Sequence, residues 1–115
     1  IGNTSAPAIA AGAGAGTSPT VSLTKATDLS GVINVTTGTL PTLSATVVTV
    51  TFNVAYGSAP KVVLTCANTA ACALQGISMV YVPDANITTT AFDAVAGTTA
   101  LAGATTYLWT YSVTQ

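Results

Sequence analysis

Strict alternation between apolar and hydroxyl-bearing residues is the feature that most restricts what this chain can fold into. Over residues 46–54, one side of an extended backbone carries apolar residues and the other carries threonines and an asparagine. The apolar residues are Val48, Val50, Phe52 and Val54. Residues 106–113 repeat the pattern with aromatic side chains in the apolar positions. A repeat of two is the repeat of a β-strand that is buried on one face. Both segments are therefore expected to pack one face against a second layer.

Five further segments have a similar β-forming composition, and turn residues separate them. They are residues 20–24, 32–36, 61–65, 77–82 and 87–92, with 61–65 expected to be buried on both faces. Short strands at a spacing of roughly ten residues are typical of a β-sandwich or barrel. The sequence predicts an all-β domain over residues 20–115, a jelly-roll-like β-sandwich of about seven to eight antiparallel strands. Residues 67–73 are expected to hold a helical turn, and residues 94–104 a loop.

Residues 1–19 differ from the rest of the chain because they are almost entirely small. Gly and Ala alternate over residues 12–16, and Pro7 and Pro19 flank the small-residue run. Small side chains bury too little apolar area to offset the entropy of ordering the chain. Two interpretations stay open: a flexible linker, or an extended N-terminal Gly/Ala arm ordered against a neighbouring subunit. On the second, deletion of residues 1–19 is expected to leave a folded domain that no longer assembles.

Charge is nearly absent, and this excludes several classes of function. The charged residues are Lys25, Lys61, Asp28, Asp84 and Asp93, whereas Ser numbers 8 and Thr 23. Nucleic-acid binding requires several cations to neutralise phosphates, and two lysines do not supply them. The same shortage argues against an anionic membrane surface, and no run of about 20 apolar residues predicts a membrane-spanning helix. Without a histidine there is no nucleophilic triad, so we expect neither catalysis nor a cofactor.

The predicted core is thin for a domain of this size. Its large members are Phe52, Phe92, Trp109 and Met79, together with Leu, Ile and Val residues. A domain of about 100 residues with so many Ala and Thr gains little stability from its own core. Association with copies of the same chain would bury further surface. We therefore expect a homo-oligomer whose neighbours cover much of the uncharged exterior.

Two small groups of residues are candidates for chemistry. Cys66 and Cys72 lie in an Ala-rich segment, where an even count predicts a disulfide. Two buried free thiols are the other interpretation, and two thiols without a histidine match no zinc pattern. Asp84, Asn86 and Asp93 offer oxygens that suit Ca²⁺, but a Pro-Asp-Ala-Asn turn is the favoured interpretation.

The last predicted strand carries Tyr107, Trp109 and Tyr111 on one face. Aromatic rings at this spacing can stack on sugar rings, which makes the three residues candidates for contact with a host-surface glycan. They also supply most of the aromatic mass available for the core, and the core interpretation is favoured. A glycan-binding face requires exposed rings, whereas a core requires buried ones.

Five stretches of the chain together resemble one group of proteins in their order. They read GAGAGTSP at 12–19, TDLSGVINVTTGT at 27–39, VTVTF at 48–52, AYGSAPKVVL at 55–64 and ATTYLWTY at 104–111. In this order they resemble the C-terminal β-domains of fibre-like and capsid-surface (decoration) proteins of tailed bacteriophages and prophages. The resemblance covers residues 12–115 and rests on composition and strand order. The Cys66 and Cys72 pair departs from it, because a plain Ala/Pro-rich loop is expected at that place.

The resemblance implies a non-enzymatic module on the virion surface, at the end of a fibre or on the capsid. It implies a homotrimer that contacts other virion proteins, and it brings no active site. Two alternatives stay open. One is a bacterial surface filament or adhesin subunit that polymerises when its arm adds as a strand to the next subunit. The other is a carbohydrate-binding fibre tip that uses the aromatic face of residues 107–111.

Overall fold

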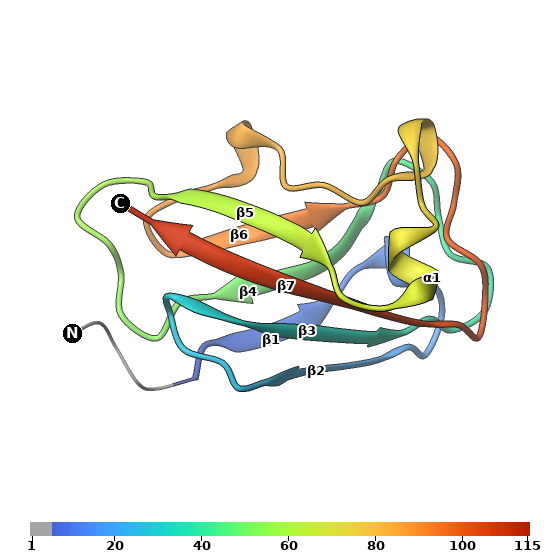
Figure 1. The fold of residues 1–115 in the computed structure, drawn as a ribbon, viewed down its shortest axis with the longest axis horizontal. Coiled ribbons are helices and arrows are strands. Elements are labelled where there is room, and N and C mark those ends of the chain that lie inside the picture. The colour runs from blue at the N-terminus through green and yellow to red at the C-terminus, as the bar shows by residue number, and fades with distance from the viewer. Residues whose placement is uncertain (1–5) are drawn as a thin grey trace.

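The computed structural model of this chain describes residues 6–115, which form a sandwich of two antiparallel β-sheets (Figure 1). The strands are β1 (Ala8–Ala11), β2 (Thr20–Thr24), β3 (Ser30–Thr36), β4 (Thr46–Thr51), β5 (Lys61–Cys66), β6 (Ala91–Val95) and β7 (Thr106–Thr114). The helical turns are η1 (Ala13–Ala15), α1 (Thr69–Cys72), η2 (Gly76–Ser78) and η3 (Asp84–Asn86). The strand order is β1-β4-β6 in one sheet and β2-β3-β7-β5 in the other. The predicted all-β sandwich is confirmed.

The core lies between the two sheets and is made by the alternating residues of their strands. The four-stranded sheet contributes Ile33, Trp109 and Tyr111, and the three-stranded sheet contributes Val50 and Phe92, all of them buried. The rings of Phe92 and Tyr111 meet between the sheets with their centroids 5.5 Å apart. Burial of one such side chain is worth about 2 kcal/mol. The predicted one-sided burial of β7 is confirmed, because its intervening Thr and Ser residues lie outside the core.

β4 is shorter than the predicted strand and irregular at its start. It ends at Thr51, and Val54, expected on its buried face, is exposed. The pairing with β6 shifts register between Thr46 and Val48. As a result Val47 and Val48 are both buried, because a bulge re-aims one side chain relative to its neighbour.

The N-terminal segment is part of the sandwich, which corrects the predicted boundary at residue 19. β1 pairs antiparallel with β4 of the same chain. In η1 Ala15 is fully buried, and a Cβ atom on Gly14 would lie 2.6 Å from the carbonyl oxygen of Ala45. The Gly/Ala repeat therefore permits close backbone approach within its own chain. Residues 1–5 of the predicted arm lie outside the described residues.

This placement also changes what truncation is expected to do. Deletion of residues 1–19 would remove β1, which is paired along its length, and the buried turn η1. The unpaired edge of β4 and the vacated space beside Ala45 would then face solvent. The structure therefore does not support the expectation that the remaining chain stays folded.

The connection between β5 and β6 holds the largest departures from the predicted strands. Residues 77–82 do not form a strand: η2 occupies their start, and Tyr81 makes an isolated bridge with Val95. The strand predicted at 87–92 lies further along the chain, as β6. Met79, expected in the core, is half exposed.

β5 is an edge strand, which corrects the prediction that it is buried on both faces. Val62 and Leu64 face the interior and are half-buried, whereas Val63 is 58% exposed. The helical turn expected within 67–73 is confirmed as α1. The loop expected within 94–104 is confirmed from the end of β6 onward.

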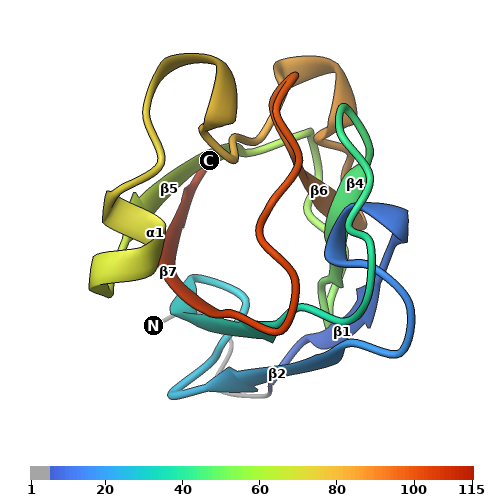
Figure 2. The same cartoon turned by 90° about the vertical axis from the view of Figure 1, so that its right-hand side faces the viewer.

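The two seams between the sheets are closed in different ways (Figure 2). On one side β1 and β2 lie beside each other. On the other side the connection from α1 to β6 arches between β5 and β6. This arch carries the exposed side chains of Ile77, Met79 and Tyr81.

Candidate functional site

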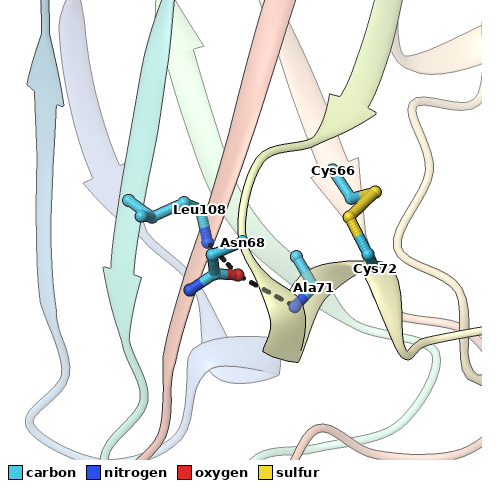
Figure 3. The surroundings of a disulfide bond; sticks show 5 residues. All are labelled: Cys66, Asn68, Ala71, Cys72 and Leu108. Atoms are coloured by element: carbon cyan, nitrogen blue, oxygen red, sulfur yellow. Dashed lines mark hydrogen bonds between the residues drawn. A yellow bond between two sulfur atoms is a disulfide. The ribbon is translucent and has the colours of Figure 1, made fainter.

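A disulfide joins the last residue of β5 to the last residue of α1 (Figure 3). The Sγ atoms of Cys66 and Cys72 are 2.02 Å apart. This confirms the disulfide and removes the interpretation of two buried free thiols. Both cysteines are exposed. The bond closes a short loop and holds α1 against the end of the four-stranded sheet.

Asn68 attaches the same turn to β7 from inside the disulfide loop. Its Oδ1 accepts hydrogen bonds from the N–H of Ala71 at 2.9 Å and from the N–H of Leu108 at 3.2 Å (Figure 3). Its Nδ2 donates to the carbonyl oxygen of Thr106 at 3.0 Å. The first bond caps α1, and the other two extend the pairing of β5 with β7. The disulfide and the three hydrogen bonds of Asn68 therefore give the turn at residues 66–72 a structural role.

The aromatic residues of β7 are buried, which contradicts their candidate role as a glycan-contact face. Tyr107 and Trp109 are each 3% exposed, and Tyr111 is fully buried. The rings of Tyr107 and Trp109 stack with centroids 5.6 Å apart. The hydroxyl of Tyr107 accepts a hydrogen bond from the N–H of Ala102 at 3.1 Å. The favoured core interpretation is confirmed.

Two of the three candidate calcium ligands, Asn86 and Asp93, are hydrogen-bonded within the protein. The Oγ1 of Thr49 donates to Oδ1 of Asp93 at 2.7 Å, and the Nδ2 of Asn86 donates to Oδ2 of Asp93 at 3.4 Å. Asp84 begins η3 and is exposed, which confirms the favoured turn. Among residues 6–115, no group of three His, Cys, Asp or Glu residues is placed to hold a metal ion.

The buried carboxylate of Asp28 is the polar site that sequence reasoning missed. Asp28 is 2% exposed. Its Oδ1 accepts a hydrogen bond from the N–H of Asn53 at 2.8 Å, and its Oδ2 accepts one from the N–H of Val54 at 2.9 Å. These partners are backbone groups about 25 residues further along the chain. Since every residue type except proline offers such a group, no sequence motif marks the site.

Two tyrosine hydroxyls complete the Asp28 cluster. Tyr56 donates to the carbonyl oxygen of Asp28, and Tyr111 donates to that of Thr27, each at 2.6 Å. Burial, and then the negative charge of Asp28, raise the pKa of Tyr56 above its ordinary value. The same causes raise the pKa of Tyr111 to about 12. Both hydroxyls therefore stay protonated at neutral pH, and they fix the connection between β2 and β3 to the loop after β4 and to β7.

An apolar groove of about 330 Å³ lies on the arch between β5 and β6. Its walls come from Ser44, Gly76, Ile77, Met79, Tyr81 and residues 96–98. Ile77 is 70% exposed, and Met79 and Tyr81 are each 49% exposed. No charged residue lines this groove, which we call the 77–81 groove. Large apolar side chains gathered at one exposed place make the groove a candidate interaction surface.

Comparison of this chain with protein-family models, with curated proteins and with solved structures finds no match. None of the helices formed by residues 6–115 is long and apolar enough to span a membrane. The described part of the chain thus contains a disulfide, a buried polar cluster and an exposed apolar groove. Of these three features, the groove is the one that exposes apolar side chains to solvent.

Proposed function

We propose that this chain is a non-enzymatic structural module of a virus-particle surface, part of a phage fibre or a head-decoration protein. The proposal combines the all-β sandwich with the resemblance of residues 12–115 to phage surface domains. On this proposal the module lies on the outside of the virion and contacts other virion proteins. It assembles with copies of itself, and a closed trimer is the form that the resemblance implies.

The observation that supports self-association is the 77–81 groove on an almost uncharged chain. Covering Ile77, Met79 and Tyr81 with another copy would remove apolar surface from water, at about 25 cal/mol per Å². None of the five charged residues lines the groove, so this contact desolvates no charge. Surface charge normally helps to keep soluble proteins apart, and this chain carries little of it.

Light scattering after size-exclusion chromatography, with and without reductant, tests the proposal. A mass that is a small whole multiple of 11.2 kDa supports a closed module. A ladder of growing masses supports an open filament. A single-chain mass at every concentration contradicts self-association.

Paired variants test whether the groove is the contact surface. Ile77→Lys combined with Met79→Lys places two cations in the groove and is expected to lower the mass of the assembly. Thr90→Lys adds a cation at an exposed turn outside the groove and is expected to leave the mass unchanged. If the groove variant keeps the wild-type mass, the groove is not the contact, and the proposal loses its main support.

A bacterial surface filament or adhesin subunit is the second candidate. The observation that favours it is the outer edge of β5, with which no strand formed by residues 6–115 pairs. A strand from a neighbouring subunit can add to such an edge. The predicted donor already pairs with β4 as β1, so donation requires β1 to leave its own sheet. Long head-to-tail polymers in electron micrographs would favour this candidate.

A further inference from the structure

We propose that the outer edge of β5 pairs with the same edge of a second copy across a two-fold axis, joining two four-stranded sheets into one. The inference rests on the proposed function and deepens it, because it names a contact through which copies associate. The contact is a strand edge and not the 77–81 groove. The two surfaces can therefore be tested by separate substitutions.

β5 presents backbone groups that its own sheet leaves open. Over residues 6–115, β7 is the only strand that pairs with β5. The N–H of Ala67 donates to the carbonyl oxygen of Leu108 at 2.8 Å. In an antiparallel pair every second residue bonds to the neighbouring strand, so this bond fixes which residues of β5 bond to β7. The backbone groups that face β7 are those of Lys61, Val63 and Thr65, and the groups that face outward are those of Val62, Leu64 and Cys66.

The side chains of β5 suit an added strand. Val63 is 58% exposed on the outer face of the sheet, between the exposed residues Lys61 and Thr65. Exposed β-branched edges pair readily with other chains, and monomeric proteins block them with charges, prolines or bulges. Here the strand has one charge, at its first residue, and its centre carries none.

One antiparallel register fits these groups. It sets Val63 opposite Val63 of the second copy, Val62 opposite Leu64, and Lys61 opposite Thr65. Val62 and Leu64 then exchange N–H···O bonds, because the backbone groups of both face outward. The Val63 pair falls at a position without such bonds, where the two Cα atoms approach to about 4.5 Å. Two exposed valines therefore cover each other on the axis.

The ends of β5 limit the paired segment to this length. Pro60 precedes the strand and has no N–H to donate. At the other end, Cys66 is tied to α1 by its disulfide, and the chain turns toward β7 at Asn68 (Figure 3). The ladder is thus confined to the outward groups between Pro60 and Cys66.

The placement of charge favours a second copy in this orientation. In the two-fold pair the two Lys61 side chains lie at opposite ends, so like charges do not face each other. The other edge of the sheet is β2, and a head-to-tail pairing of β5 with β2 would bring Lys61 to the same end as Lys25. In addition, β2 lies beside β1 of its own chain, whereas no strand formed by residues 6–115 lies on the outer side of β5 in its sheet.

A substitution on the proposed axis gives the first test. Val63→Lys sets two cations opposite each other and is expected to reduce the light-scattering mass to half the wild-type value, from dimer to monomer or from hexamer to trimer. Val63→Thr keeps a β-branched side chain and is expected to keep the wild-type mass. Thermal unfolding and Trp109 fluorescence check that both variants fold, as expected for an exposed position.

Cross-linking gives the second test, because it depends on register. Val63→Cys is expected to form a disulfide-linked pair of chains under mild oxidation. Lys61→Cys alone is expected to stay single, whereas a mixture of Lys61→Cys and Thr65→Cys chains is expected to cross-link. These outcomes distinguish the stated register from a non-specific contact.

The results separate this inference from the function on which it rests. If wild type is oligomeric and Val63→Lys has the same mass, the edge pairing is wrong and the self-assembling module stands. A Val63→Cys chain that stays single within an oligomer leads to the same conclusion. A wild-type protein of single-chain mass overturns both.

Discussion

The two ends of β7 are fixed to the rest of the molecule by different means. Near its start, the exposed disulfide and Asn68 hold α1 against the strand. Near its end, Tyr111 donates to Thr27 within the buried cluster of Asp28. The start of β7 is therefore held by hydrogen bonds from a surface turn that a disulfide closes, and the end of β7 by hydrogen bonds away from water.

This difference determines what each end is sensitive to. A disulfide stabilises a protein largely by restricting the unfolded chain. Because reductants cleave the bond, its contribution to stability depends on redox conditions. A buried hydrogen-bonded cluster is stable only while each polar group keeps a partner, and no buried side-chain N or O atom among the described residues lacks one. The stability of the buried end is thus sensitive to single substitutions, and the stability of the exposed end is sensitive to redox conditions.

The largest effect is expected at the buried end. Asp28→Ala leaves the N–H groups of Asn53 and Val54 without their acceptor and is expected to lower the free energy of unfolding by about 3 kcal/mol. Urea unfolding followed by Trp109 fluorescence measures this. Asp84→Ala, at an exposed carboxylate, is the control and is expected to change stability by less than about 0.5 kcal/mol. Equal losses in the two variants would contradict the special role of Asp28.

The next effect is expected at the exposed end. Replacing Cys66 and Cys72 by Ser is expected to lower the free energy of unfolding by about 2 kcal/mol, the chain-entropy value for so short a loop. Wild type in reductant is expected to match the double variant, and the variant itself is expected not to respond to reductant. A response of the variant to reductant would show that the reductant acts elsewhere.

A smaller loss is expected from the amide inside the disulfide loop. Asn68→Ala removes the cap of α1 and two bonds to β7, which we expect to cost about 1.5 kcal/mol. Thr69→Ala, the exposed neighbouring residue, is the control and is expected to stay close to wild type. Amide hydrogen exchange at Ala71 and Leu108 gives a local readout, since both N–H groups lose their acceptor. Unchanged protection there would contradict the described bonds.

The smallest effect at neutral pH is expected from Tyr111→Phe, about 1 kcal/mol for one lost hydrogen bond. The substitution has its clearest effect on how stability depends on pH above pH 10. The pKa of Tyr111 is raised from 10.0 to about 12 in the folded protein, so the folded state keeps this proton when the unfolded state has lost it. Stability is therefore full below pH 10 and falls between pH 10 and 12. Unfolding measured across this range is expected to show a smaller fall in the variant, and an equal fall would assign the effect to other groups.

The strands that could be predicted are those whose neighbours bury one face. β7 and most of β4 carry an apolar residue at every second position, and the structure buries these residues. Spacing and composition leave two interpretations of the cysteines open, a disulfide and two free thiols. The position of α1 determines which one holds, because it places Cys72 beside Cys66.

The features that could not be predicted depend on partners distant in sequence. The run from Ile77 to Val82 has the composition of a strand, but it crosses the seam between the sheets and pairs only at Tyr81 among its residues. The small residues of β1 gave no periodic signal, and the partner that orders them is β4. The role of Asp28 likewise arises from backbone groups of another loop.

The central place of β7 also has a consequence for biosynthesis. β7 follows every other strand in the chain, yet it lies between β3 and β5 in its sheet, and Thr36 meets Thr106 across a separation of 70 residues. At a translation rate of roughly 5–20 residues per second, β7 is synthesised about 4–14 s after β3. During this time its edge is available to any nascent chain on the same messenger. Nascent chains of one polysome can therefore compete with β7 for the edge of β3 until each chain has completed its own sheet.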